Sequence, residues 1–106
     1  MLTSELSGGV VELVELSLFF MPVLSVFYGI VIKMYYHDHN PPHFHVSYGD
    51  DEAFLAIASG RVLAGHLPPR VLRLVVEWRR KHAKELDSAW NAVQLDKAPK
   101  RIAPLE

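Results

Sequence analysis

The strand-forming part of the chain begins with the stretch Val26-Phe27-Tyr28-Gly29-Ile30-Val31-Ile32-Lys33-Met34-Tyr35-Tyr36. β-Branched and aromatic residues dominate this stretch and no helix cap interrupts it, which is typical of a β-strand. Alternate residues of a strand point to the same face. We therefore expect one core-facing row, made of Val26, Tyr28, Ile30, Ile32 and Met34.

Shorter strands and a helical region are predicted after this stretch. The strands are expected over residues 43–48, 53–58 and 61–64, and their short connections favour an antiparallel meander. Pro68-Pro69 can open a helix, because the first turn tolerates proline, and apolar residues then recur at helical spacing over residues 70–95. The predicted fold class is α+β: an antiparallel sheet of three or four strands against one long or broken C-terminal helix.

Length and composition limit the organisation of the chain. The 106 residues fit a single α+β domain over residues 21–106, preceded by an extension, residues 1–20, that is either disordered or accessory. The formal net charge of −1 argues against a generally basic nucleic-acid binder, and the lack of cysteine excludes cysteine-ligated zinc. Residues 16–32 are uncharged but contain Pro22 and follow acidic residues, so we expect no membrane span and a cytoplasmic protein.

Histidines are concentrated in the run His37-Asp38-His39-Asn40-Pro41-Pro42-His43-Phe44-His45. On extended backbone, His37 points to the same side as His39, and His43 to the same side as His45. The two prolines stiffen the connection between the pairs, and a stiff loop loses little entropy when it binds something. This hairpin is therefore the candidate functional site.

Three interpretations of the hairpin remain open. Three of its histidines, with or without Asp38, could ligate zinc or a similar divalent metal; the candidate ligands are His37, His39, His43 and His45. His43 and His45 could instead be catalytic and pass protons, with His37 or His39 as metal ligand or proton partner. In the third interpretation the histidines bond to neighbouring backbone and only define a tight hairpin.

A second candidate surface lies on the predicted helix, where basic residues follow helical steps: Arg70, Arg73, Arg80 and Lys84. A positive helix face can contact RNA or a partner protein. Equally, Glu77 can pair with its basic neighbours, which makes an ordinary solvated helix face. The sequence leaves both interpretations open.

Several segments resemble a bacterial family, domain of unknown function 4160. They are the runs 27–36, 60–68, 72–78 and 102–106, and above all Asn40-Pro41-Pro42-His43-Phe44-His45. The resemblance covers about residues 21–106. Members of this family are similar in gene setting to small paired modules, and some have been proposed as toxin–antitoxin components. The resemblance implies a small protein partner and assigns no catalytic residue.

The expected function is therefore that of an intracellular binding module in a two-protein, toxin–antitoxin-like system, acting through the histidine-rich hairpin. The alternative is a histidine-dependent or metal-dependent hydrolase or ribonuclease. RNA is a candidate partner, and so is a second copy of the chain that pairs through the edge of the 26–36 strand. Whether the protein is an enzyme stays open.

Overall fold

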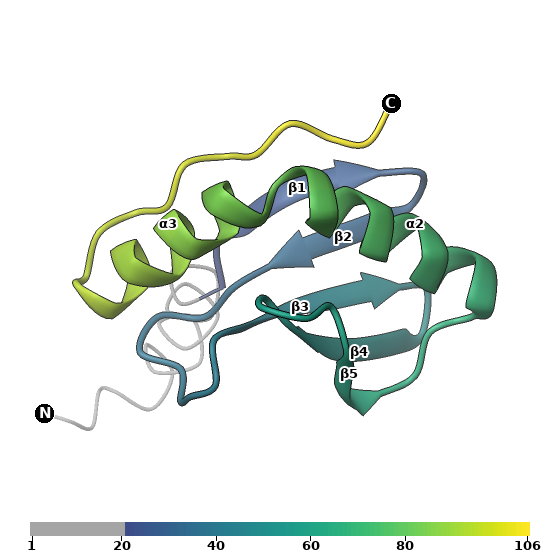
Figure 1. Cartoon of the computed structure of the whole chain (residues 1–106), viewed down its shortest axis with the longest axis horizontal. Helices are drawn as coiled ribbons and strands as arrows, with labels where there is room; N and C mark the ends of the chain where they lie inside the picture. The colour runs from purple at the N-terminus through teal and green to yellow at the C-terminus, as the bar shows by residue number, and fades with distance from the viewer. Residues whose placement is uncertain (1–20) are drawn as a thin grey trace, which may run out of the picture.

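The computed structural model describes residues 21–106, so the expected N-terminal extension, residues 1–20, lies outside the described part. Its strands are β1 (Val23–Phe27), β2 (Ile30–Lys33), β3 (His43–Tyr48), β4 (Asp51–Ala56) and β5 (Val62–Gly65). Its helices are α2 (Pro69–Lys81) and α3 (Ala83–Gln94). Figure 1 shows the two helices lying across one face of the sheet, which confirms the predicted α+β class.

The sheet has five antiparallel strands in the order β1-β2-β3-β4-β5, rather than the three or four expected. The additional strand arises because the stretch predicted as one strand over residues 26–36 is the hairpin β1–β2. Tyr28 and Gly29 form its turn with φ of 51° and 78°, the left-handed backbone that two-residue hairpin turns require. Glycine is the residue that ordinarily indicates this conformation, and because the first turn residue is Tyr28, the sequence did not predict the turn.

The hairpin also corrects the predicted core row. Ile30, Ile32 and Met34 are fully buried, as expected. Val26 is 49% exposed and Tyr28 is 61% exposed, because the reversal at the turn breaks the alternation between them and Ile30. The core-facing row therefore starts after the turn rather than before it.

The C-terminal helical region is broken at His82. The sequence left open one long helix or a broken one, and the structure has the broken one. The φ of His82 is −123°, and its backbone N–H bonds back to the carbonyls of Trp78 and Arg79. Trp78 is completely buried between the sheet and the helix pair, with its ring centroid 5.6 Å from that of Phe27 and 6.0 Å from that of Phe44. The helices and this core cover one face of β3. The side chains on its other face form part of the candidate functional site.

The C-terminal segment returns to the first strand. The backbone N–H of Ile102 donates to the carbonyl of Leu24 in β1 over 2.8 Å, and the indole N–H of Trp78 donates to the carbonyl of Ala103 over 2.8 Å. Ile102 and Leu105 are buried against the core. The segment thus ties the outer edge of β1 to α2 (Figure 1).

No helix within residues 21–106 is long and apolar enough to cross a lipid bilayer.

Candidate metal centre

Strand β3 places the two histidines of the Asn-Pro-Pro-His-Phe-His run on one side of the sheet. Phe44 and Val46 point into the core and are fully buried, so His43 and His45 point to the opposite face. Both imidazoles are nevertheless buried, with only 2% of His43 and 5% of His45 exposed. Two adjacent, buried imidazoles on one strand are the first half of the site.

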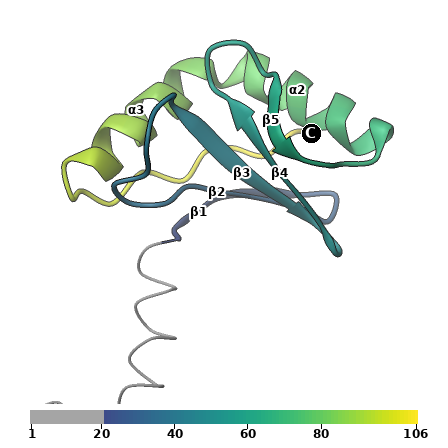
Figure 2. The ribbon, with the colours of Figure 1, turned by 90° about the horizontal axis from the view of Figure 1, so that it is seen from below.

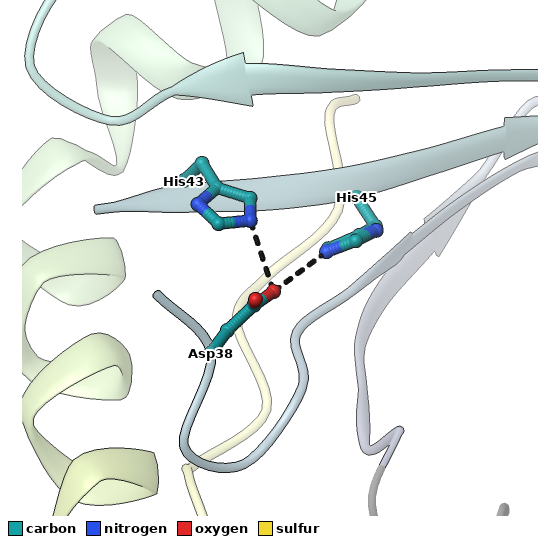
Figure 3. A group of neighbouring side chains, drawn as sticks. All are labelled: Asp38, His43 and His45. Atoms are coloured by element: carbon teal, nitrogen blue, oxygen red, sulfur yellow. Dashed lines mark hydrogen bonds and ion pairs between the residues drawn. The ribbon is translucent and has the colours of Figure 1, made fainter. Parts of the chain in front are cut away.

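The loop between β2 and β3 supplies the second half, the carboxylate of Asp38. Its Oδ2 atom lies 2.9 Å from Nε2 of His43 and 3.0 Å from Nε2 of His45. Figure 3 shows the carboxylate facing both imidazoles. Its Oδ1 atom accepts a hydrogen bond of 2.9 Å from the backbone N–H of His39. One carboxylate oxygen is therefore shared by two imidazole nitrogens, and these three side chains could hold a metal ion.

The hydrogen bond at Nδ1 of His43 determines whether Nε2, the nitrogen that faces Asp38, carries a proton in the neutral imidazole. Nδ1 of His43 lies 2.7 Å from the carbonyl oxygen of Pro41. A carbonyl can only accept, so Nδ1 carries the proton and donates it. In the neutral imidazole Nε2 then presents a lone pair to a carboxylate oxygen 2.9 Å away. Two acceptors this close need a cation between them, which is either a proton or a metal ion.

Burial and nearby charges set the protonation states of His45 and Asp38. Burial lowers the pKa of His45 below 6.5, and the nearby His43 lowers it further, although the hydrogen bond to Asp38 opposes both effects. Burial would raise the pKa of Asp38, but hydrogen bonds from His45 and the His39 backbone, with the charges of His43 and His45, hold that pKa below 3.8. Near neutral pH the site therefore contains an ionised carboxylate and a neutral imidazole, the forms that bind metal ions.

Aromatic rings surround the imidazoles. The ring of Tyr35 stacks on His45 with centroids 4.3 Å apart, and the ring of Phe54 lies 4.1 Å from His45 on the neighbouring strand. The ring of Trp90 in α3 lies 5.5 Å from that of His43. These rings contribute to the burial of both imidazoles, and electrostatic interactions are stronger where water is scarce.

The remaining histidines of the run occupy different positions. His39 is exposed; its Nδ1 donates to the carbonyl of Asn40 over 3.2 Å, and its Nε2 lies 3.7 Å from Oδ1 of Asp38. It is therefore beside the Asp38–His43–His45 group without belonging to it. His37 is not part of the group and pairs through Nε2 with the carboxylate of Asp96. The structure thus brings together two of the four candidate histidines, and Asp38 is the third member of the group.

The basic candidates lie on the helices. Arg70, Arg73 and Arg80 are on α2 and Lys84 is in the first turn of α3, and all of them are exposed. Of the pairings expected for Glu77, its carboxylate lies 3.5 Å from the ammonium of Lys81. Arg73 and Arg80 border a shallow groove on the outer side of α2. None of these four basic residues belongs to the Asp38–His43–His45 group.

Some residues that support the site were not singled out from the sequence. Tyr35 was assigned only to a strand, and Gln94 and Asp96 come from the end of α3. Gln94 donates to the backbone carbonyl of Asp38 over 3.2 Å, a contact across 56 positions of the chain. No local pattern predicts such a contact, because the helix end and the loop meet only after the sheet and helices have packed.

Fold and site together define a small α+β domain with a buried group of two histidines and one carboxylate, held by a central strand and the loop before it. The chain belongs to the family described as domain of unknown function (DUF4160), whose model matches residues 29–91. The matched region contains Asp38, His43 and His45. Comparisons with curated proteins and with solved structures gave no match.

Proposed function

We propose that this protein binds a divalent transition-metal ion, with zinc as the first candidate, through Asp38, His43 and His45. The observation that carries the proposal is a pair of close acceptor atoms. Nε2 of His43 and Oδ2 of Asp38 lie 2.9 Å apart, while Nδ1 of His43 donates its proton to the carbonyl of Pro41. A metal ion satisfies both acceptors at once. Imidazole and carboxylate donors suit zinc, and no thiolate is needed.

The distances support this proposal. Ligands of four-coordinate zinc lie about 2.0–2.2 Å from the ion, so neighbouring ligand atoms are roughly 3.3 Å apart. The two imidazole nitrogens lie 2.9 and 3.0 Å from the carboxylate oxygen, so an ion needs only a few tenths of an ångström of outward movement. The bond from His43 to the Pro41 carbonyl is also the kind of support that fixes the orientation of metal-ligating histidines.

The proposed role of the ion is to hold a recognition loop. Directly beside the ligands, the residues His39, Asn40, Pro41 and Pro42 are exposed. With Asp38 on one side of this loop and His43 on the other, one ion would bind both of its ends. The function proposed is therefore a metal-stabilised binding module whose loop contacts a small protein partner in a two-protein, toxin–antitoxin-like system.

A metal-dependent hydrolase is the second candidate, favoured by one observation. Three protein ligands leave a coordination position for water, as in catalytic zinc sites, where the ion lowers the pKa of that water. His39 is exposed 3.7 Å from the carboxylate ligand, close enough to exchange protons with a substrate or water there. In this candidate function His43 and His45 are metal ligands rather than proton-transfer groups.

The test of metal binding is a calorimetric titration of tag-free, chelator-treated protein with zinc. We expect one ion per chain with a dissociation constant below 1 µM. The variant His43→Ala/His45→Ala should lose this binding, and His66→Ala, which removes an exposed histidine after β5, should retain it. Because the double variant opens a buried site, circular dichroism must show that it is folded. Binding weaker than 100 µM, or binding equal in the double variant, contradicts the proposal.

A second experiment separates the two candidate functions. Zinc-loaded protein would be incubated with a mixed RNA pool, alongside the His39→Gln variant. RNA cleavage that His39→Gln slows and zinc removal abolishes supports the hydrolase. Binding of RNA without cleavage, lost in the charge-reversal variant Arg73→Glu/Arg80→Glu, supports the basic helix face as a contact surface. If the protein neither cleaves nor binds RNA, the protein-binding module remains the proposal, and partner capture with and without zinc tests it.

A further inference from the structure

The end of α3 contacts the loop that carries Asp38. The backbone N–H of His37 donates to the carbonyl of Val93 over 3.3 Å, and the side-chain amide of Gln94 donates to the carbonyl of Asp38 over 3.2 Å. The imidazole of His37 pairs with the carboxylate of Asp96, just beyond the helix. Three contacts therefore join the loop to the end of α3 and the residues just after it, which Figure 2 shows beside the loop before β3.

Backbone conformation shows how closely the two segments depend on each other. His37 has φ of 57° and Asp96 has φ of 61°, both in the left-handed region. A residue other than glycine in this region costs on the order of 1 kcal/mol and persists only where its surroundings hold it. Here the two residues are bonded to each other, so each turn helps to hold the other. The chain direction entering Asp38 is thereby fixed by α3.

Helix α3 also contacts His43, another of the proposed metal ligands. Trp90 lies one helical turn before Gln94 and packs its ring 5.5 Å from that of His43. The position of the carboxylate relative to the two imidazoles thus depends on α3 as well as on β3. On the loop side, the carboxylate is contacted by the neighbouring His39, through its backbone N–H at 2.9 Å and its Nε2 at 3.7 Å, and His39 belongs to the same loop.

We propose that the end of α3 sets the metal affinity of the site, with Gln94 and Asp96 as positioning residues for the ligand Asp38. This inference rests on the proposed metal site and names what controls it. Neither residue offers an atom to the ion. They act by holding the backbone of His37 and Asp38, so that the carboxylate oxygen stays between the two imidazole nitrogens before the ion arrives. Such pre-organisation reduces the cost of binding.

The test compares zinc affinity among variants of the full chain by competition with a chromophoric chelator. Gln94→Ala and Asp96→Ala should each weaken zinc binding about 10-fold or more, the range found for outer-shell partners of metal ligands. Asp96→Asn keeps an acceptor for His37 and should restore most of the affinity. Asn91→Ala, an exposed position on the same helix, is the matched control and should bind zinc as the wild type does.

A second readout separates positioning from general destabilisation. Cobalt would replace zinc, and its visible absorption reports the coordination geometry directly. Positioning predicts an altered cobalt spectrum in Gln94→Ala and Asp96→Ala while the circular dichroism of the apoprotein stays that of the wild type. Wild-type zinc affinity and an unchanged cobalt spectrum in both variants overturn the inference. If the wild type itself binds no zinc, the proposed function fails, and that result is distinct because no variant is needed to see it.

Discussion

The ring of Tyr35 lies stacked on the imidazole of His45, with centroids 4.3 Å apart and planes inclined by 24°. Tyr35 follows β2 and His45 lies in β3, so the stack covers the imidazole of His45 in the candidate metal centre. It contributes to the burial that lowers the pKa of His45. Burial also raises the pKa of Tyr35, helped by Glu52 and Asp38, so its phenol stays neutral.

Removing this stack should weaken metal binding. In Tyr35→Ala the imidazole of His45 becomes exposed and free to rotate, so we expect zinc affinity to fall by roughly 10-fold. Tyr35→Phe preserves the ring and should bind zinc as the wild type does. The measurement is chelator competition at pH 7.5. Equal losses in Tyr35→Ala and Tyr35→Phe would assign the effect to the hydroxyl group and contradict the stacking explanation.

The metal-free protein should lose stability as the pH falls below about 6.5, the value for an unperturbed histidine. Because the pKa of His45 is lowered in the folded state, the unfolded chain takes up this proton at a pH where the folded chain does not. Stability therefore decreases with decreasing pH down to the folded-state pKa. Urea denaturation in the presence of a chelator, at pH 7.5, 6.0 and 5.0, measures this dependence. His45→Gln should show a flatter dependence; an identical slope would mean that His45 is not its source.

Gly65 is expected to tolerate no side chain. Its φ is +85°, and a Cβ atom there would lie 2.1 Å from the backbone carbonyl oxygen of Glu52. Because backbone cannot move aside cheaply, Gly65→Ala should destabilise the protein by about 3 kcal/mol or more, or prevent folding. Gly49 also has a left-handed φ of +58° but open space around it, so Gly49→Ala should cost only about 1 kcal/mol. Urea denaturation of both variants checks the difference.

The side chain of Arg79 connects α2 to the turn between β4 and β5. Its Nε and Nη2 atoms donate to the carbonyls of Ile57 and Ala58, each over 2.7 Å. Loss of these charged hydrogen bonds in Arg79→Ala should lower the free energy of unfolding by about 2 kcal/mol. Arg80→Ala, which removes an exposed neighbour, should change it by less than about 0.5 kcal/mol. Similar losses in the two variants would contradict a specific role for Arg79.

Local patterns in the sequence predicted the strands after residue 42 and the helical region, and they made His43 and His45 candidate site residues. Alternation along β3 put both histidines on one face, and this was confirmed. The turn at Tyr28-Gly29 was missed because aromatic residues favour strands and only one of its two residues is a glycine. His37 was grouped with His39 on the assumption of extended backbone, which its left-handed φ of 57° does not satisfy. Its pairing with Asp96 depends on packing between distant segments, which no local pattern encodes.

The bond from Ile102 to Leu24 has a consequence for how copies of the chain can associate. Within residues 21–106, the outer side of β1 is tied to the C-terminal segment, while β5 pairs only with β4 and shows exposed Val62 and Leu63 on the other edge. A sheet that can grow from one edge only closes after a single two-fold pairing, whereas fibre growth needs two open edges. Cutting the chain before Ile102 would remove this bond and leave the outer side of β1 as a second open edge, from which edge-to-edge pairing of copies could continue.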